Sequence, residues 1–217
     1  MKKISKKNKI RIQKFSLKLR RNLIIFFILS LVVFQIVFSF KESNQGMVAG
    51  EATDSITVTV SVVPSISIDS PPNVTLSPNI EETGAAIGDA TWNVETNNSD
   101  GWQLEVAADA SPAMTSGGNS FADYGETVED TPESWSIANN VSEFGFGATG
   151  TYIEAKFGAG LYMGFNGTTK EQVASRAAAS EGSGDDTTVI FRAEVGSAKS
   201  QSIGDYTATI TATATTL

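Results

Sequence analysis

The chain of 217 residues contains neither histidine nor cysteine, which excludes Ser-His-Asp triads, cysteine nucleophiles, ordinary zinc sites and disulfide bonds. Its charge is unevenly divided, because 11 of the 16 basic residues lie in residues 1–50 and 23 of the 24 acidic residues lie in residues 51–217. Residues 51–217 therefore hold five basic and 23 acidic residues, a net charge of −18, so we expect them to bind neither nucleic acid nor an anionic membrane through charge.

The first 50 residues have the pattern of an export segment. Ten lysines and arginines precede an apolar run of 18 residues, Leu23–Phe40. A signal peptide usually has a shorter apolar core, and a transmembrane helix needs about 20 residues. The run therefore fits either a cleaved signal peptide, with small residues near Gly50 and Ala52 for the peptidase, or a retained single-pass N-terminal anchor. In both cases the basic flank stays inside and residues 51–217 face the exterior.

Alternation predicts the first strand over 54–63, where apolar residues share one face and Thr57, Thr59 and Ser61 share the other. The apolar residues of this face are Ile56, Val58, Val60 and Val62. Pro64 interrupts the pattern, which resumes as a short strand at 66–68. A further short strand is predicted at 74–76.

The clearest hairpin is predicted for Ala90–Glu95 and Trp102–Ala107. The link between them, Thr-Asn-Asn-Ser-Asp-Gly, consists of turn residues. The side chains expected to point into the core are Trp92, Val94, Trp102, Leu104 and Val106.

Residues 109–133 are poor in apolar side chains and predict a long excursion with little structure of its own. Short aromatic-rich strands separated by glycines are then predicted at 135–137, 143–146, 152–157 and 161–165. The segment 169–180 fits a helical turn by its alanines and a strand by its surroundings, and both alternatives stay open.

Two further strands complete the pattern. In Thr187–Val195 we expect Val189, Phe191, Ala193 and Val195 to point inward, and Asp205–Leu217 alternates to the last residue. Short alternating strands with little helix predict an all-β domain over 51–217, a single immunoglobulin-like antiparallel β-sandwich behind the N-terminal hydrophobic helix.

Calcium is the one cofactor that the composition suggests, because calcium prefers clustered oxygen ligands. Two acidic groups are candidates, one in the excursion and one before the strand at 187. The candidate ligands are Asp123, Glu126, Glu129, Asp130 and Glu133 in the first group, and Asp185 and Asp186 in the second. Solvated acidic loops that bind nothing are the alternative.

Three features carry a resemblance to exported bacterial surface proteins: the opening ITVTVSVVPSISI, the central GWQLEV at 101–106 and the closing GDYTATITAT at 204–213. The Trp102–Leu104 motif is similar to the first Trp-x-Leu of WxL-domain proteins, which attach non-covalently to peptidoglycan. Ala-Thr-Ala stands at 212–214, where that family places its second motif. The opening and closing strands also resemble fimbrial and spore-coat subunits. The resemblance implies Trp102 and Leu104 as wall contacts, although both residues also fit the core of the predicted hairpin.

Together these features predict a non-enzymatic, exported cell-surface protein with a structural or adhesive role. Its partners would be a cell-wall polymer or copies of itself, joined through sheet edges, with the membrane met only by the N-terminal segment. An alternative is a calcium- or carbohydrate-binding module that uses the 109–133 excursion and nearby aromatics. Those aromatics are Trp135, Phe144, Phe146, Tyr152 and Tyr162. A glycosidase with a carboxylate pair is the remaining alternative.

Overall fold

The computed structural model describes residues 20, 22–26, 28, 30 and 52–217. The described residues before 31 are helical, and no helix among the described residues is long and apolar enough to cross a bilayer. Contacts divide the chain into two units, Met1–Thr59 and Val60–Leu217, and each is described by itself. The predicted signal or anchor segment and its cleavage position near Gly50 lie almost entirely outside the described residues.

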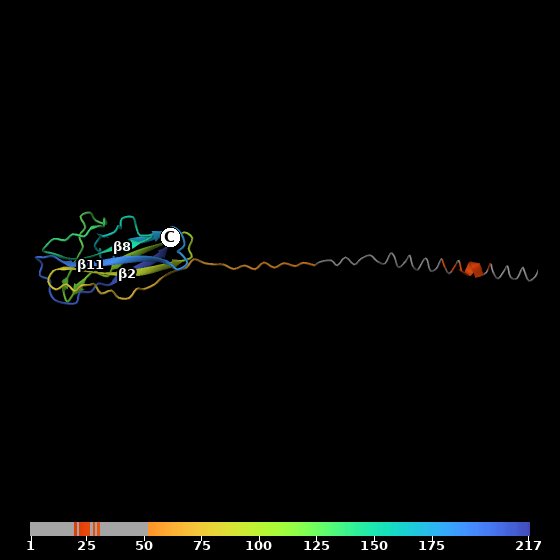
Figure 1. Ribbon diagram of the computed structural model, residues 1–217, viewed down its shortest axis with the longest axis horizontal. Coiled ribbons are helices and arrows are strands. Elements are labelled where there is room, and N and C mark those ends of the chain that lie inside the picture. The colour runs from red at the N-terminus through yellow and green to blue at the C-terminus, as the bar shows by residue number, and fades with distance from the viewer. Residues whose placement is uncertain (1–19, 21, 27, 29, 31–51) are drawn as a thin grey trace, which may run out of the picture. The chain divides into compact units, whose positions relative to one another are not determined.

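Strands build the second unit, which contains no helix between residues 60 and 217, all of them described. The central strands of the larger sheet lie side by side in Figure 1. In chain order the strands are β1 (Ile66–Ile68), β2 (Gly84–Thr96), β3 (Trp102–Ala108), β4 (Thr115–Ser116), β5 (Asn119–Ser120), β6 (Ala122–Asp123), β7 (Glu133–Ser134), β8 (Ser142–Gly150), β9 (Leu161–Tyr162), β10 (Glu171–Arg176), β11 (Asp185–Val195) and β12 (Ile210–Thr216). The predicted all-β fold is confirmed.

The strands form two larger sheets and two small ones. The five-stranded sheet has the order β1-β2-β11-β8-β6, and the three-stranded sheet has the order β10-β3-β12. β4 pairs with β5, and β7 pairs with β9. All pairs are antiparallel except β6 with β8.

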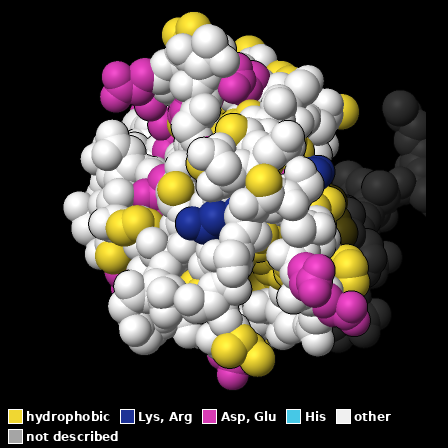
Figure 2. Space-filling view, turned by 90° about the vertical axis from the view of Figure 1, so that its left-hand side faces the viewer, with side chains coloured by type: hydrophobic (Ala, Val, Ile, Leu, Met, Phe, Trp, Pro, Cys, Tyr) yellow, Lys and Arg dark blue, Asp and Glu magenta, His cyan; other side chains and the backbone are white. Residues whose placement is uncertain are grey.

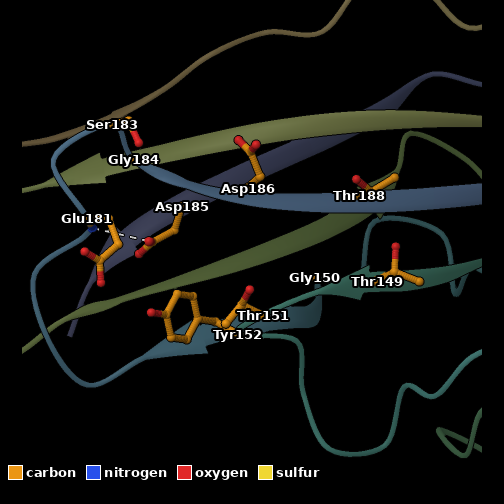
Figure 3. Close-up of a pocket in the computed structure, with 10 residues that line it drawn as sticks. All are labelled: Thr149, Gly150, Thr151, Tyr152, Glu181, Ser183, Gly184, Asp185, Asp186 and Thr188. Carbon is orange, nitrogen blue, oxygen red and sulfur yellow. Dashed lines mark hydrogen bonds between the residues drawn. The ribbon is translucent and has the colours of Figure 1, made fainter.

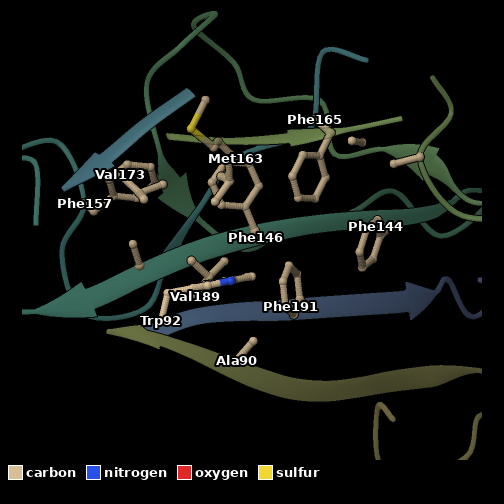
Figure 4. Close-up of a cluster of buried hydrophobic side chains, with 14 of the residues drawn as sticks. Ala90, Trp92, Phe144, Phe146, Phe157, Met163, Phe165, Val173, Val189 and Phe191 are labelled. Carbon is tan, nitrogen blue, oxygen red and sulfur yellow. The ribbon is translucent and has the colours of Figure 1, made fainter. Parts of the chain in front are cut away.

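The two larger sheets share one hydrophobic core (Figure 4). The five-stranded sheet contributes Phe146 and Val189, and the three-stranded sheet contributes Trp102 and Leu104, all of which are fully buried. Burying one tryptophan contributes about 5 kcal/mol by apolar area, as an upper bound. The inward set predicted for β11 is confirmed, because the odd-numbered residues of this strand are buried from end to end.

The predicted hairpin at residues 90–107 is wrong in its pairing, although both strands exist. β2 lies in the five-stranded sheet and β3 in the three-stranded sheet, so the turn-like link carries the chain from one sheet to the other. Both strands carry large inward side chains, and these meet within the shared core. Gly101 makes the crossing possible with a φ of 108°, at a point where a Cβ would collide with the Arg176 carbonyl.

The predicted strand at 54–63 is not formed. Residues 52–65 belong to no strand, and only the short continuation at Ile66–Ile68 pairs, with β2. Every apolar residue on the predicted inward face is 81–85% exposed. These residues are Ile56, Val58, Val60 and Val62. The predicted strand at 74–76 is also absent, although Val74 and Leu76 pack against the core.

The 109–133 region is more ordered than its composition predicts. It contributes β4, β5 and β6 and buries Met114, Phe121 and Tyr124, so few apolar side chains are enough to fasten it. The open alternative at 169–180 is resolved as strand β10. Residues 135–137 and 152–157 form no strand, apart from an isolated bridge between Ile153 and Ala174.

Candidate functional site

The residues expected to contact a wall polymer lie in the core. Trp102 and Leu104 are both completely buried. The indole Nε1–H of Trp102 donates to the Asp185 Oδ2 at 3.0 Å. The structure therefore places this Trp-x-Leu pair where a surface polymer does not reach.

The acidic residues of the excursion do not cluster into one site, and several of them accept hydrogen bonds within the fold. The Asp123 carboxylate accepts hydrogen bonds from the Ser111 hydroxyl and the Ala113 N–H, at 2.7 and 2.8 Å. Glu133 accepts from the Thr127 N–H at 3.1 Å. Glu126 accepts a long bond from the Gly164 N–H, whereas the neighbouring Glu129 and Asp130 are exposed. Across the described part of the chain, no three acidic side chains form a group that could hold a metal ion.

Asp185 is the centre of a buried polar joint between the two larger sheets. Only 2% of its side chain is exposed, and the Arg176 guanidinium donates to both of its carboxylate oxygens at 2.9 and 3.0 Å. Trp102 donates from β3, Arg176 comes from β10, and Asp185 begins β11. Hydrogen bonds raise the pKa of Arg176 above its ordinary value, with the larger effect from Asp185 and the smaller from Glu181, so this cation keeps its charge.

A polar hollow of about 410 Å³ opens beside this joint (Figure 3). Its lining combines hydroxyl groups of Thr149, Thr151 and Thr188 with the carboxylates of Glu181 and Asp186. The Tyr152 ring forms part of the wall, but the Arg176 guanidinium lies 4.5 Å from its centroid and occupies one face.

The carboxylates around the hollow already have partners. Glu181 is paired with Arg176 at 2.7 Å, and the Asn93 amide donates to Asp186 at 2.7 Å. A calcium ion would have to displace these contacts, so the structure does not assemble the predicted Asp185–Asp186 site.

The aromatic residues proposed for sugar stacking pack against one another. Phe144 and Phe146 belong to the core, and Tyr162 is only 9% exposed. Trp135 stacks on Tyr124 with ring centroids 4.3 Å apart, and the Arg192 guanidinium lies 5.1 Å from its ring. Burial raises the pKa of Tyr124, and Glu133 adds to the effect. This cluster covers the outer face of β8, where glycines leave room for it.

The edges of the three-stranded sheet differ from each other. On the β10 side, the Ser175 N–H donates to the Tyr152 carbonyl, and the Glu154 N–H donates to the Val173 carbonyl, both at 2.9 Å. On the other side, within the described chain, β12 pairs with β3 alone. One edge is therefore covered and the other is bare.

The surface shows no concentrated patch of one kind at the end drawn in Figure 2. Acidic side chains lie around the periphery, and hydrophobic side chains form small separate spots. The face drawn in Figure 2 therefore offers no broad apolar site for a partner.

Comparison with models of known families, with curated proteins and with solved structures finds no match for this chain. The resemblance to WxL-domain, fimbrial and spore-coat proteins therefore stays a prediction.

Sequence reasoning missed Arg176 and Asn97. Only five basic residues follow residue 50, and in the described part four of them form ion pairs, which makes each a candidate structural partner. Asn97 was visible only as one turn residue among several. Its side chain in fact binds the Ser65 N–H and the Val63 carbonyl, at 2.7 and 3.1 Å.

Proposed function

We propose that this chain is an exported, non-enzymatic structural protein of the cell surface. Its acidic domain would be an immunoglobulin-like β-sandwich outside the membrane. The basic and apolar N-terminal segment would either be cleaved after export or remain as the membrane anchor. The observation that carries the proposal is the pairing of a closed core with an exposed apolar strand sequence, because this combination suits a building block better than a ligand-binding cup.

Chemistry supports a non-catalytic role. The chain lacks the histidine and cysteine side chains that most hydrolytic mechanisms use. Burial raises the pKa of Glu143 on β8, and its register neighbour on β11 is Glu194, which is bonded to Arg192 at 2.7 Å. Glu194 is thus held in an ion pair instead of being free to act as the second carboxylate that a glycosidase requires.

Surface labelling tests the location. A Thr91→Cys variant of the full chain carries a single thiol at an exposed position of β2, since the native sequence has no cysteine. We expect a membrane-impermeant maleimide to label intact cells expressing it. Val189→Cys is the matched control, because its buried thiol would react only after denaturation. Labelling of Thr91→Cys only after the cells are opened would refute the external location.

A second candidate function is the binding of a polar, sugar-like ligand in the hollow. The hydroxyl groups of Thr149 and Thr151 beside the Tyr152 ring favour it. Screening the protein against a glycan array, with Tyr152→Ala as the control, tests this candidate. Binding that the control retains, or no binding at all, would remove it.

A further inference from the structure

One segment has the sequence pattern of a β-strand but pairs with no strand in the described part of the chain. Residues 55–68 contain no charged side chain, and the stretch from Ile56 to Val62 alternates β-branched apolar residues with threonine and serine. Its apolar residues are 81–85% exposed, and the structure assigns residues 52–65 to no strand. Soluble proteins normally interrupt such a sequence with charge, because an exposed strand of this kind pairs with other chains.

The edge of β12 that faces away from β3 is a second feature without a partner among the described residues. The Leu217 N–H donates to the Gly101 carbonyl, and the Thr209 carbonyl accepts from the Asp109 N–H. Because bonding alternates along an antiparallel pair, the odd-numbered residues of β12 face β3. The N–H and C=O groups of the even-numbered residues therefore point away from it. These residues are Ile210, Ala212, Ala214 and Thr216.

This edge also lacks the usual protection against pairing. Residues 206–217 contain no charge, no proline and no glycine. β1 lies close to β12 but is only three residues long and pairs with β2 alone.

The core is incompletely covered along the same edge. Ile210, Ala212 and Ala214 face the core but are only partly buried, whereas Val173 and Ala174 of the opposite edge strand are fully buried. Added apolar side chains beside β12 would remove exposed apolar surface from water.

We propose that residues 54–63 of one copy of this chain add as a strand to the free edge of β12 in a second copy. The alternating apolar face of the segment would then lie over the half-covered core residues Ile210, Ala212 and Ala214. Within the segment, the stretch 56–62 matches β12 in length, in alternation of apolar residues with threonine or serine, and in its lack of charged side chains. This inference rests on the proposed structural function and names the contact through which copies join.

The junction at Pro64 favours exchange between copies. The Asn97 side chain binds the backbone on both sides of this proline, at Val63 and Ser65, and so fixes the chain where it enters β1. Proline also restricts the residue before it to extended conformations. Pairing with β12 of a second copy needs no reversal of the chain at this junction.

Cross-linking between two single-cysteine variants tests the contact directly. Full chains carrying Thr59→Cys and, with a different tag, Thr213→Cys are co-expressed, and the opened cells are treated with a mild oxidant. Since neighbouring strands place paired side chains on the same face, we expect a mixed disulfide dimer. To scan the register, cysteine is also placed at Thr57 or Ser61 instead of Thr59, and at Thr211 or Thr215 instead of Thr213. Thr91→Cys replaces Thr213→Cys in the control, because this exposed threonine lies on an interior strand.

A pair of aspartate variants provides the functional counterpart. Val58→Asp/Val60→Asp would bury two carboxylates in the joined copies, so we expect the mixed dimer to be lost. Thr57→Asp/Thr59→Asp adds the same charge to the outer face, and we expect this variant to retain the dimer. Its cysteine is placed at the best cross-linking position other than 57 and 59. Equal losses in both variants would contradict the proposed face.

The outcomes separate this inference from the proposed function. No mixed dimer in any register, with Thr91→Cys labelled on intact cells, would overturn strand exchange and leave the surface role standing. A chain carrying both Thr59→Cys and Thr213→Cys that forms only an internal disulfide would show pairing within one copy and would also overturn it. A mixed dimer without surface labelling would support the exchange and refute the location.

Discussion

β11 and residues 54–63 have the same sequence pattern and opposite surroundings. Both alternate apolar residues with mostly polar ones, over lengths typical of strands. In β11 the alternate side chains Val189 and Val195 are 0% and 2% exposed, with β2 on one side and β8 on the other. In the N-terminal segment, Val58 and Val60 are each 85% exposed. Alternation therefore specifies a surface that needs covering, but it does not specify what covers it.

The two edges of the three-stranded sheet repeat this contrast. The β10 edge is closed by hydrogen bonds to residues 152 and 154, and its inward residue Val173 is fully buried. The β12 edge lacks such a cover in the described chain, and its inward residue Ala212 is only partly buried. Within the described chain, residues 54–63 pair with no sheet and β12 pairs on one side only, and the proposed exchange between copies rests on these two observations.

The same substitution in the two alternating segments sharpens the comparison most strongly. Val189→Asp would bury an unpaired carboxylate in the core, which costs several kcal/mol and is comparable with the whole stability of a domain, about 5–15 kcal/mol. We expect loss of cooperative thermal unfolding, measured by circular dichroism. Val60→Asp introduces the same charge at an exposed site, and we expect an unchanged unfolding midpoint in the isolated protein. A large drop for Val60→Asp would show that the segment is already covered.

The contrast explains how much of the structure was predictable. β11 was predicted with the correct face because its alternation and its burial are both continuous. The placement of β2 and β3 in different sheets was not predicted, since a turn-rich link between two apolar strands fits a hairpin and a crossing between sheets equally well. The segment 54–63 shows the opposite failure, where strong local propensity met no partner within the described chain.

The candidate site followed the same rule. The acidic residues at 185 and 186 were visible in the sequence, but their function depended on Arg176 and Asn93, which are distant in the chain. Two adjacent aspartates carry no information about such distant partners, so the same local sequence fits both a calcium site and a buried ion pair. Long-range pairing, not composition, separated the two.

The joint at the start of β11 gives the next largest effect. Arg176→Met would leave the nearly buried Asp185 without its cation, and we expect a loss of about 3–5 kcal/mol in the free energy of unfolding, measured with denaturant. Lys156→Met is the matched control, because Lys156 and Glu171 are more exposed and such pairs contribute about 0–1 kcal/mol.

A double variant tests the cause. Arg176→Met with Asp185→Asn removes the buried charge together with its partner, and the amide oxygen can still accept from Trp102. We expect part of the lost stability to return. No recovery would mean that Arg176 acts through its packing on Tyr152 and not through charge.

A smaller effect is expected at the point where the free segment joins the sheet. Asn97→Ala removes the two solvent-exposed hydrogen bonds that join this side chain to the backbone of Val63 and Ser65. We expect a loss of about 1 kcal/mol and faster proteolysis around residues 60–68. Ser99→Ala, at an exposed position in the same link, serves as the control. Equal cleavage rates in both variants would show that Pro64 alone fixes this junction.

The smallest effect concerns a carboxyl group on β8, next to β11. Burial raises the pKa of Glu143 above its ordinary value, although a hydrogen bond from the Gly125 N–H lowers it part of the way back. A raised pKa means that the folded state holds the proton more tightly than the unfolded state, so this group destabilises the fold as the pH rises from about 4 toward 7. Glu143→Gln removes the charge and can still accept from Gly125, so we expect a slightly higher unfolding midpoint at pH 7 and no gain at pH 4. Glu95→Gln, at an exposed position of β2, should leave the midpoint unchanged at both values. An equal gain for Glu143→Gln at both pH values would show that packing, and not the ionisation of Glu143, causes the difference in stability.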